Sequence, residues 1–348
     1  MMPSATTDLA NRWSRLRLER PAIRIRDAAV SLGVSELELV ALGTGLSATP
    51  LATDWRSLLS NIPAVGRVMC LTRNEHCVHE RHGRFEDVRV GGPHGLVLGP
   101  DIDLRLFLGV WRHGFAVREP IRNAERLSLQ FFDASGEAVH KIYAASETDR
   151  RILESLIERY RAEPTTIAIK ARPQPDVDRP DAEIDIEGLR DAWRSLTDTH
   201  KFFGVLKAFK VGRVQALRLA GEEFAQELPI HALRQALQAA SEESMPVMIF
   251  VGSTGCIQIH TGPVRRLVDT HGWLNVLDPD FNLHLREAGI ARVFAVRKPT
   301  HDGVVTSIEV FDAHDRTILL MFGARKPGEP ERRDWRTLVA RLAKRVAA

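Results

Sequence analysis

The chain has 348 residues, which is long enough for two domains of ordinary size. Hydrophobic residues make up 44% and charged residues 27%, a composition that is typical of globular proteins and excludes an intrinsically disordered chain. Lysine and arginine number 48 against 45 aspartates and glutamates, so the charge balance is too even to indicate a nucleic-acid-binding protein.

The first half of the sequence is predicted to contain a helical start and then a long series of strands. Residues 8–62 are predicted to be helical, with Asp8 as a cap and Pro21 as a break. Residues 67–144 are predicted to form strands, because apolar positions alternate and turn residues separate them. A helix over residues 147–161 closes this half. The pattern predicts an α+β fold.

A proline-rich stretch over residues 164–185 is predicted to be a linker, because Pro164, Pro173, Pro175 and Pro180 exclude a continuous helix. The predicted domains are therefore an N-terminal repeat over residues 1–163 and a C-terminal repeat over residues 186–348.

The two halves repeat each other without gaps over more than sixty residues. The string Phe-Ala-Val-Arg at residue 115 recurs at residue 294, an offset of 179 (294 minus 115), and the same offset maps Cys77 onto Cys256. A period this long indicates a duplicated domain, because short repeat arrays have periods of roughly 20–50 residues. We therefore predict two similar domains, each with a long antiparallel sheet flanked by helices.

The second copy contains an insertion and a distinctive histidine. Near the first helix the offset is only 164 (190 minus 26), so the second copy has gained fifteen residues (179 minus 164) within residues 201–228. On a helix capped by Asp198 or Thr199, four residues would share one face. They are His200, Phe203, Gly204 and Lys207. The first copy has Glu36 where the second has His200, and a glycine one turn after an imidazole lets a flat ligand approach the backbone.

Several uncommon strings occur along the chain in residues 68–75, 103–105, 198–203, 273–278, 281–285 and 322–325. Their content and order resemble the cytoplasmic haem-utilisation proteins of Gram-negative bacteria, the HemS/ChuS/HmuS/PhuS group of haem-trafficking or haem-degrading proteins. The resemblance covers nearly the whole chain, and the internal duplication is itself a mark of that family.

The resemblance implies that haem (iron protoporphyrin IX) is bound in a cleft between the two halves, with no separate metal. His200 would be the axial ligand of the iron, and Arg105 of the first half would face the other side of the ring as a distal residue with a catalytic role. Lys298 and Arg325 match the basic residues near the haem propionates, whereas helical spacing makes Lys207 and Lys210 candidate haem-binding residues, with ammonium groups a turn or two beyond His200. Phe107 and Phe250 are candidate walls for the ring, with core packing as the alternative for each.

The sequence departs from the family in one respect. Some members place a tyrosine near the propionates late in the second half, but Tyr143 and Tyr160 are the only tyrosines of this chain, and Phe322 stands in that stretch. A tyrosine contact therefore cannot be expected here.

Other histidines give weaker predictions. His76, Cys77, His79 and His82 resemble a metal cluster, but on a strand over residues 76–82 they would alternate between two faces, which disfavours a shared site. His113 and His284 are predicted to be structural, although His284 aligns with Arg105 in the repeat (284 minus 105 is 179).

The leading hypothesis is a cytoplasmic protein that receives imported haem and either traffics or degrades it for iron acquisition. A haem oxygenase-like enzyme and a carrier without directed oxygenase activity need the same ligand, so the sequence leaves this choice open. As a carrier, it would take haem from an inner-membrane transporter and pass it to a separate haem oxygenase. A less favoured alternative is a duplicated interaction module that binds nucleic acid through the arginine-rich start.

The predicted location rests on three observations. The three cysteines form no CxxC pair, which suits a reducing compartment. The N-terminal residues lack the apolar stretch of a signal peptide, and no apolar run approaches the roughly 18 residues of a membrane span. We therefore predict a cytoplasmic protein that is not embedded in a membrane.

Overall fold

The computed structural model describes residues 5–121, 124–172, 177–326 and 328–344, which fall into two compact units. The first unit comprises the described residues of Met1–Thr72 and Arg81–Pro173, together with Ser253–Ile257. The second unit comprises Arg73–Glu80 and the described residues of Gln174–Gly252 and Gln258–Ala348. Each unit thus contains a short segment from the other half of the sequence. Pro173 and Pro175 of the predicted linker lie outside the described residues, and the predicted domain boundaries stay predictions.

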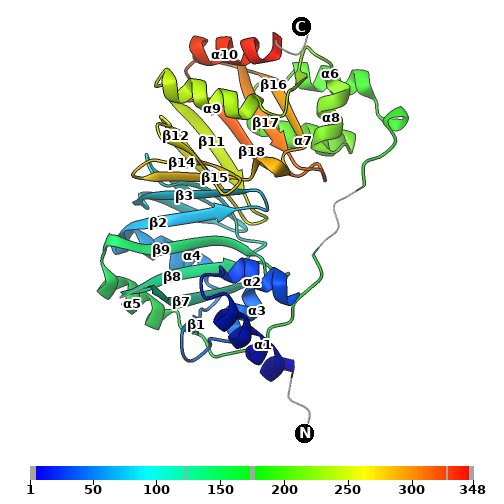
Figure 1. Cartoon of the computed structure of the whole chain (residues 1–348). Coiled ribbons are helices and arrows are strands. Elements are labelled where there is room, and N and C mark those ends of the chain that lie inside the picture. The colour runs from blue at the N-terminus through cyan, green and yellow to red at the C-terminus, as the bar shows by residue number, and fades with distance from the viewer. Residues whose placement is uncertain (1–4, 122–123, 173–176, 327, 345–348) are drawn as a thin grey trace. The chain divides into compact units, whose positions relative to one another are not determined.

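The first unit is a mixed α and β structure (Figure 1). Its helices are α1 (Ala5–Glu19), α2 (Ile25–Leu32), α3 (Glu36–Ala41), α4 (Trp55–Asn61), η1 (Ile62–Val65) and α5 (Arg150–Arg159). Its main antiparallel sheet has the order β1-β7-β8-β9-β2, formed by β1 (Ala48–Pro50), β7 (His113–Ile121), β8 (Ala124–Phe132), β9 (Ala138–Thr148) and β2 (Gly66–Arg73). A smaller antiparallel meander is formed by β4 (Asp87–Gly91), β5 (His94–Leu98) and β6 (Asp103–Phe107).

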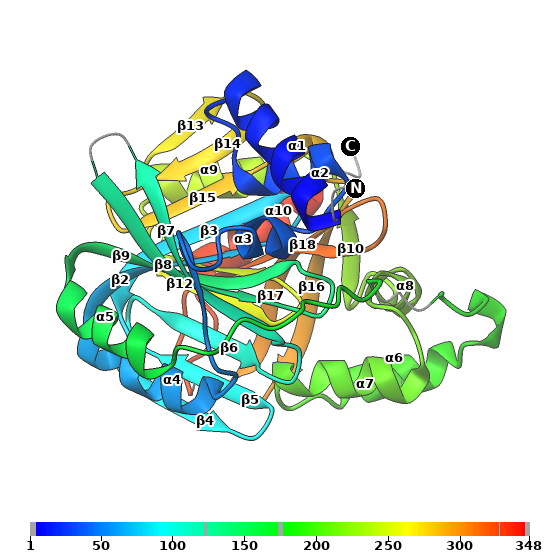
Figure 2. The same cartoon turned by 90° about the horizontal axis from the view of Figure 1, so that it is seen from below.

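The main sheet of the first unit buries both of its faces, because successive side chains of a strand point to opposite sides. On one face Phe115 and Val117 pack with α3. On the other face Ala116 lies in the cluster that contains the apolar residues of α4 and α5. Figure 2 shows α4 beside β4, whose Val88 and Val90 pack against the same cluster.

The second unit repeats this plan. Its helices are η2 (Asp181–Glu183), α6 (Ile186–Arg194), η3 (Thr199–Lys201), α7 (Phe202–Phe209), α8 (Arg213–Ala220), α9 (Ala232–Glu242), η4 (Glu287–Gly289) and α10 (Arg333–Lys344). Its main antiparallel sheet has the order β10-β16-β17-β18-β11, formed by β10 (Ala225–Leu228), β16 (Arg292–Thr300), β17 (Gly303–Phe311), β18 (Thr317–Gly323) and β11 (Val247–Gly252). A second antiparallel meander is formed by β13 (Leu267–Thr270), β14 (Trp273–Leu277) and β15 (Phe281–Leu285). The strands β3 (Cys77–Arg84) and β12 (Cys256–Gly262) each contribute residues to both units.

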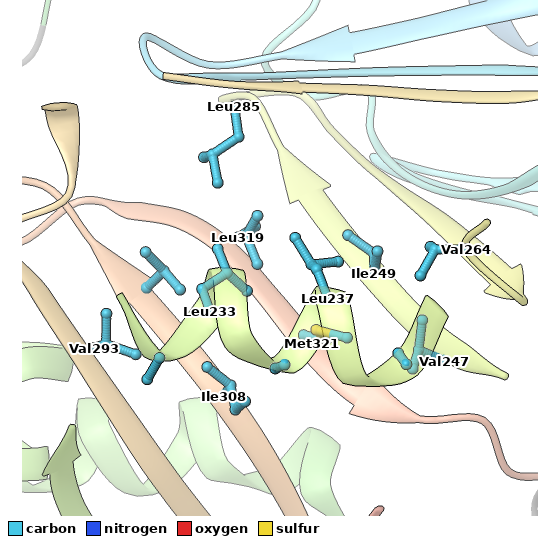
Figure 3. Packing of buried hydrophobic residues seen from close by; sticks show 14 of the residues in the cluster. Leu233, Leu237, Val247, Ile249, Val264, Leu285, Val293, Ile308, Leu319 and Met321 are labelled. Atoms are coloured by element: carbon cyan, nitrogen blue, oxygen red, sulfur yellow. The ribbon is translucent and has the colours of Figure 1, made fainter. Parts of the chain in front are cut away.

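Helices also cover both faces of the main sheet in the second unit. Figure 3 shows Leu233 and Leu237 of α9 among sheet residues that include Ile308 and Met321. The helix α10 packs on the same side, whereas α6, α7 and α8 cover Phe294 and Phe311 on the opposite face. The sheet is therefore dry on both sides wherever these helices cover it, and a polar residue placed there needs partners within the protein.

The strand register confirms the internal duplication and the α+β class. In the first unit His113 pairs with Phe132 across β7 and β8, and in the second unit Arg292 pairs with Phe311 across β16 and β17, which is the same pair 179 residues later (292 minus 113). Each pairing with the next strand has its irregularity at the equivalent residue, before Phe132 and before Phe311. One difference is α8. The second unit has the helices α7 and α8 between α6 and β10, whereas the first unit has only α3 between α2 and β1.

Some local predictions were wrong. The helix α1 begins at Ala5, so Asp8 lies within its first turn and faces Arg12 instead of capping the helix. The strand β1 interrupts the segment that was predicted to be helical, and His76 lies in the turn before β3. In the described ranges, no helix combines the length and apolar composition that a bilayer crossing requires.

Candidate functional site

His200 lies in the short turn η3 that leads into α7, and it is well placed to act as a ligand. Its side chain is 84% exposed, and its Nδ1 lies 2.7 Å from Asp198 Oδ1. The same oxygen accepts a hydrogen bond from the backbone N of His200, and these two bonds lower the pKa of Asp198. An ionised carboxylate only accepts hydrogen bonds, so Nδ1 carries the proton and Nε2 presents its lone pair. The predicted cap at Asp198 is confirmed, although His200 lies just before the α-helix.

The exposed side of α7 continues from this histidine. Phe203 is 73% exposed, and no atom lies within 4 Å of the place where a Cβ on Gly204 would stand. Lys207 follows on the exposed side, and Lys210 ends the helix in the left-handed conformation with φ 52°. This side of the helix therefore offers an imidazole, an exposed aromatic ring, an open backbone position and two ammonium groups.

A buried ion cluster lies under the same helix. Glu309 of β17 is fully buried, and its carboxylate accepts hydrogen bonds from Arg213 Nε (2.7 Å) and Nη2 (2.9 Å) and from Lys298 Nζ (2.6 Å). Burial by itself would raise the pKa of Glu309, but the charges of Arg213 and Lys298 and their hydrogen bonds outweigh it and lower the pKa. Burial also lowers the pKa of Lys298 to about 8, against the opposing charge of Glu309.

Phe202, the first residue of α7, connects this cluster to the histidine. Its ring centroid lies 4.7 Å from Lys298 Nζ and 5.3 Å from Arg213 Cζ, distances at which a cation is attracted to an aromatic face. The ring also packs edge-on against Trp193, with centroids 4.4 Å apart. The helix that follows His200 is thus attached to the core by the ring of Phe202, together with the buried Leu206 one turn later.

Lys298 is 3% exposed, which bears on its predicted role at a propionate. A contact with a bound carboxylate would require this ammonium to share or leave its bond with Glu309. The role predicted for Lys298 stays a prediction.

Two further predicted residues lie in the second unit. Phe250 of β11 pairs with Leu320, and Leu320 pairs with Glu309, so Phe250 lies on the sheet face that carries the ion cluster. Its ring centroid lies 5.1 Å from that of Phe322. Both rings are only partly buried, so this part of the face remains open to contact.

Arg325 follows β18 and lies beside the turn between β16 and β17. Its Nη1 is 3.8 Å from Asp302 Oδ2 in that turn and donates to the carbonyl oxygen of Glu329 at 3.2 Å. The neighbouring His301 donates its backbone N–H to the carbonyl of Thr197, three residues before His200. Arg325 and the turn of His200 therefore flank the same sheet corner.

Arg105 and Phe107 lie on β6 in the first unit. Their side chains share the partly exposed face of the strand, while Leu104 and Leu106 point into the core. Asp103 binds the guanidinium of Arg105, and the ring of Phe107 lies edge-on to His94 with centroids 6.2 Å apart. The open face of β6 thus carries one cation with a carboxylate partner and one aromatic ring.

Three of the other histidines contact neighbouring side chains within the second unit. His76 Nδ1 lies 2.9 Å from Arg286 Nη2, and burial and that arginine lower the pKa of His76. His79 is buried, 5.0 Å from the ring of Phe281, and Nδ1 of His284 lies 2.6 Å from Asn275 Oδ1. Across the described residues, no three histidine, cysteine or acidic side chains gather in an arrangement that would hold a metal ion.

A cavity of about 800 Å³ in the first unit lies away from the predicted site residues. Its lining includes Leu9 of α1, Arg112, His113 and Phe115. Burial and the charge of Arg112 lower the pKa of His113, so this imidazole is neutral near pH 7. We assign no function to this cavity.

The sequence analysis missed the residues that support His200. Asp198 was expected only as a cap and Phe202 only as part of the string at residues 198–203, and no role was predicted for Arg213 or Glu309. A signal for Glu309 was present, because the repeat aligns it with Gln130 (309 minus 179), so one copy has a charge where the other has an amide. Arg213 lies in the segment that only the second copy contains.

Comparison with known proteins gives consistent matches along the chain. The family model of the haemin-degrading HemS.ChuX domain matches residues 33–160 and again residues 210–342, so His200 lies between the two matched ranges. The hemin transport protein HmuS of Yersinia pestis is 38% identical over 96% of this chain and 97% of its own length.

Two solved structures are similar over their full length. Holo-PhuS, a heme-binding protein from Pseudomonas aeruginosa, is 49% identical with a TM-score of 0.93, covering 96% of this chain and 98% of that chain. The heme degrading enzyme ChuS of Escherichia coli O157:H7 is 37% identical with a TM-score of 0.91, covering 97% of this chain and 99% of that chain.

The buried lysine predicts a specific pH dependence of stability. Between its folded pKa of about 8 and its ordinary value of 10.5, Lys298 is neutral in the folded protein and protonated in the unfolded chain. The unfolded state then binds more protons, so this group makes the free energy of unfolding increase with pH in that window. Urea unfolding across this range should show that increase in the wild type relative to Lys298→Met. A difference between the two proteins that does not change with pH would show that folding does not lower the pKa of Lys298.

Proposed function

The chain belongs to the haemin-degrading HemS family, and from this premise we propose that it binds haem with His200 as the axial ligand of the iron. The observation that supports the proposal most directly is the Asp198–His200 pair. A carboxylate on Nδ1 fixes the tautomer and orientation of the imidazole and raises its basicity, which is how metal-binding histidines are prepared for coordination through Nε2. The 84% exposure of the ring leaves Nε2 accessible to a ligand as large as haem.

The surroundings of His200 suit a flat ring with two carboxylates. The open position at Gly204 permits close approach to the helix backbone, and the ring of Phe203 adds exposed apolar surface. Lys207 and Lys210 supply point charges for propionates, and Arg325 supplies a planar donor that can bind a carboxylate through two hydrogen bonds. We assign Phe250, together with Phe322, to the apolar contact with the ring.

We propose that the protein traffics haem in the cytoplasm for iron acquisition, taking it from an inner-membrane transporter and passing it to a haem oxygenase. An exposed ligand suits this role, because a second protein can approach the same ring. The phenylalanine at 322 also removes one hydroxyl donor from the propionate end, which favours release.

Directed degradation of haem is the second candidate, and Arg105 is the residue that favours it. A guanidinium on the distal side would donate hydrogen bonds and stabilise negative charge that develops there during oxygen chemistry. The haem supplies the redox chemistry in that case, whereas the protein sets access and polarity.

The ligand assignment predicts a clear difference between two histidine variants. Haemin titration followed in the Soret region should give a saturable one-to-one spectrum for the wild type and a lost or shifted spectrum for His200→Ala. His231→Ala is the matched control, because His231 is also exposed and lies at the start of a helix in the same unit. Identical spectra for His200→Ala and the wild type would remove His200 as the ligand.

The role of the carboxylate predicts a graded effect at Asp198. Asp198→Ala removes the acceptor of Nδ1–H and should weaken haem binding by about 10–100-fold, the usual cost of losing such a partner. Asp198→Asn retains an oxygen that can accept from both nitrogens, so its loss should be smaller. Equilibrium titration of the two variants checks this order. Wild-type affinity in Asp198→Ala would show that the pair does not prepare the ligand.

The choice between carrier and enzyme predicts different behaviour under catalase. If the protein is a carrier, breakdown of bound haem in the presence of a reductant should stop when catalase removes peroxide. If Arg105 directs oxygenation, a defined product should persist under catalase in the wild type and decrease in Arg105→Ala. Product analysis by chromatography separates the two, and we expect the carrier result.

A further inference from the structure

We infer that Glu309 is a positioning residue for the haem ligand: by holding Arg213 and Lys298 against the ring of Phe202, it fixes the start of α7 and therefore the place of His200. This inference rests on the proposed haem site and assigns a role to residues that do not themselves need to touch haem.

The carboxylate of Glu309 has little freedom to move. Its Oε2 accepts from Arg213 Nε, while its Oε1 accepts from Arg213 Nη2, Lys298 Nζ and Ser307 Oγ at 2.9, 2.6 and 3.1 Å. The donors come from α8, β16 and β17, so one carboxylate joins the inserted helix to two strands of the sheet. Because the group is fully buried, water cannot replace a lost partner without a rearrangement.

The two cations in turn determine where Phe202 lies. Its side chain is 2% exposed, and both the ammonium of Lys298 and the guanidinium of Arg213 approach its ring within 5.3 Å. This attraction depends on the positive charges, which are stable side by side only because Glu309 lies between them. Without the carboxylate, the two cations repel each other and Lys298 loses its proton more readily.

The imidazole of His200 has one hydrogen-bond partner within the part of the chain that the structure describes, so its position depends on how the turn and the start of α7 are held. Among the described residues, its ring is hydrogen-bonded only to Asp198, which is itself half exposed and lies in the same turn. Phe202 is the nearest buried residue that follows His200 in the chain. A shift of the Phe202 ring would therefore move the turn, and with it the direction of Nε2.

The cluster occurs only in the copy that has the histidine. The repeat aligns Glu309 with Gln130 and Lys298 with Glu119 (298 minus 179), and Arg213 belongs to a helix that the first unit lacks. The first unit keeps the same sheet and register with Gln130 hydrogen-bonded to Ser128. The fold itself thus does not require the ion cluster, which points to a role specific to the second unit.

The decisive variant is Glu309→Gln, which keeps the size of the side chain but removes its charge and replaces one acceptor oxygen by an amide that only donates. We expect haem binding at least about 10-fold weaker, as for other groups that orient a metal ligand, with a Soret spectrum that shows reduced histidine ligation. Glu36→Gln is the matched control, because Glu36 forms a buried ion pair with Lys141 in the first unit. The control should lose stability and keep wild-type haem affinity.

Tighter binding by Glu309→Gln would overturn the inference. That result would mean that Glu309 competes with the haem carboxylates for Arg213 and Lys298 and does not prepare the site. Unchanged affinity would overturn it as well. Phe202→Leu provides a second test that leaves the ion cluster intact, and it should weaken haem binding in the same direction because it removes the ring that the cations hold.

A measurement without haem separates this inference from the proposed function. Hydrogen exchange of the α7 amides in the haem-free protein should be faster in Glu309→Gln than in the wild type, and unchanged in Glu36→Gln. Unchanged exchange at α7 in Glu309→Gln would refute the positioning role. If His200→Ala binds haem like the wild type, the proposed ligand fails, while the exchange result still decides whether Glu309 seats α7.

Discussion

A carboxylate withdrawn from water in the middle of a sheet needs cations beside it, and this requirement organises the second unit around Glu309. Strand alternation directs the side chain of Glu309 toward the face that α6, α7 and α8 cover, so no solvent reaches it. Lys298 comes from the neighbouring strand, but Arg213 is available only because the chain adds α8. The inserted helix therefore completes a buried charge cluster in addition to enlarging the domain.

The helix that precedes the main sheet is attached to it differently in the two copies. In the first unit Glu36 of α3 forms a buried ion pair with Lys141 of β9, so the helix is tied down directly. The repeat places His200 and Leu320 at the equivalent positions of the second unit (36 plus 164 and 141 plus 179), where no ion pair can form. There the attachment has moved to Phe202 and the cluster beneath it. This change allows the residue at position 200 to face outward, which a structural ion pair would prevent.

Much of the fold could be predicted from the sequence, because a constant offset between two halves fixes both the duplication and the equivalence of their strands. The exposed face of His200, Gly204 and Lys207 followed from helical spacing. The start of the α-helix just after His200 could not be predicted, because a 3₁₀ turn and the first turn of an α-helix have similar spacing patterns. The buried state of Lys298 could not be predicted from the sequence either, since its partner Glu309 and the Arg213 that shares this carboxylate are 11 and 85 residues away (309 minus 298 and 298 minus 213). Long-range charge pairs leave no local pattern, and the indications of this one were the differences between the copies at Gln130 and Glu309 and at Glu119 and Lys298.

The proposed transfer of haem requires less of the local geometry than degradation of haem would. Asp198 orients His200 in the absence of a ligand, which would reduce the ordering cost of the proposed haem binding, and the exposed ring would leave a route open for removal of the haem. Degradation adds the requirement that Arg105 act on the distal side, although its guanidinium already pairs with Asp103 and would have to share that charge. The proposed carrier needs only the first arrangement, and the positioning role proposed for Glu309 would allow its haem affinity to be adjusted from within the buried cluster. An imidazole that is held in orientation but remains accessible, at the start of a helix packed on a buried ion cluster, is therefore the arrangement that the proposed reversible binding of haem would use.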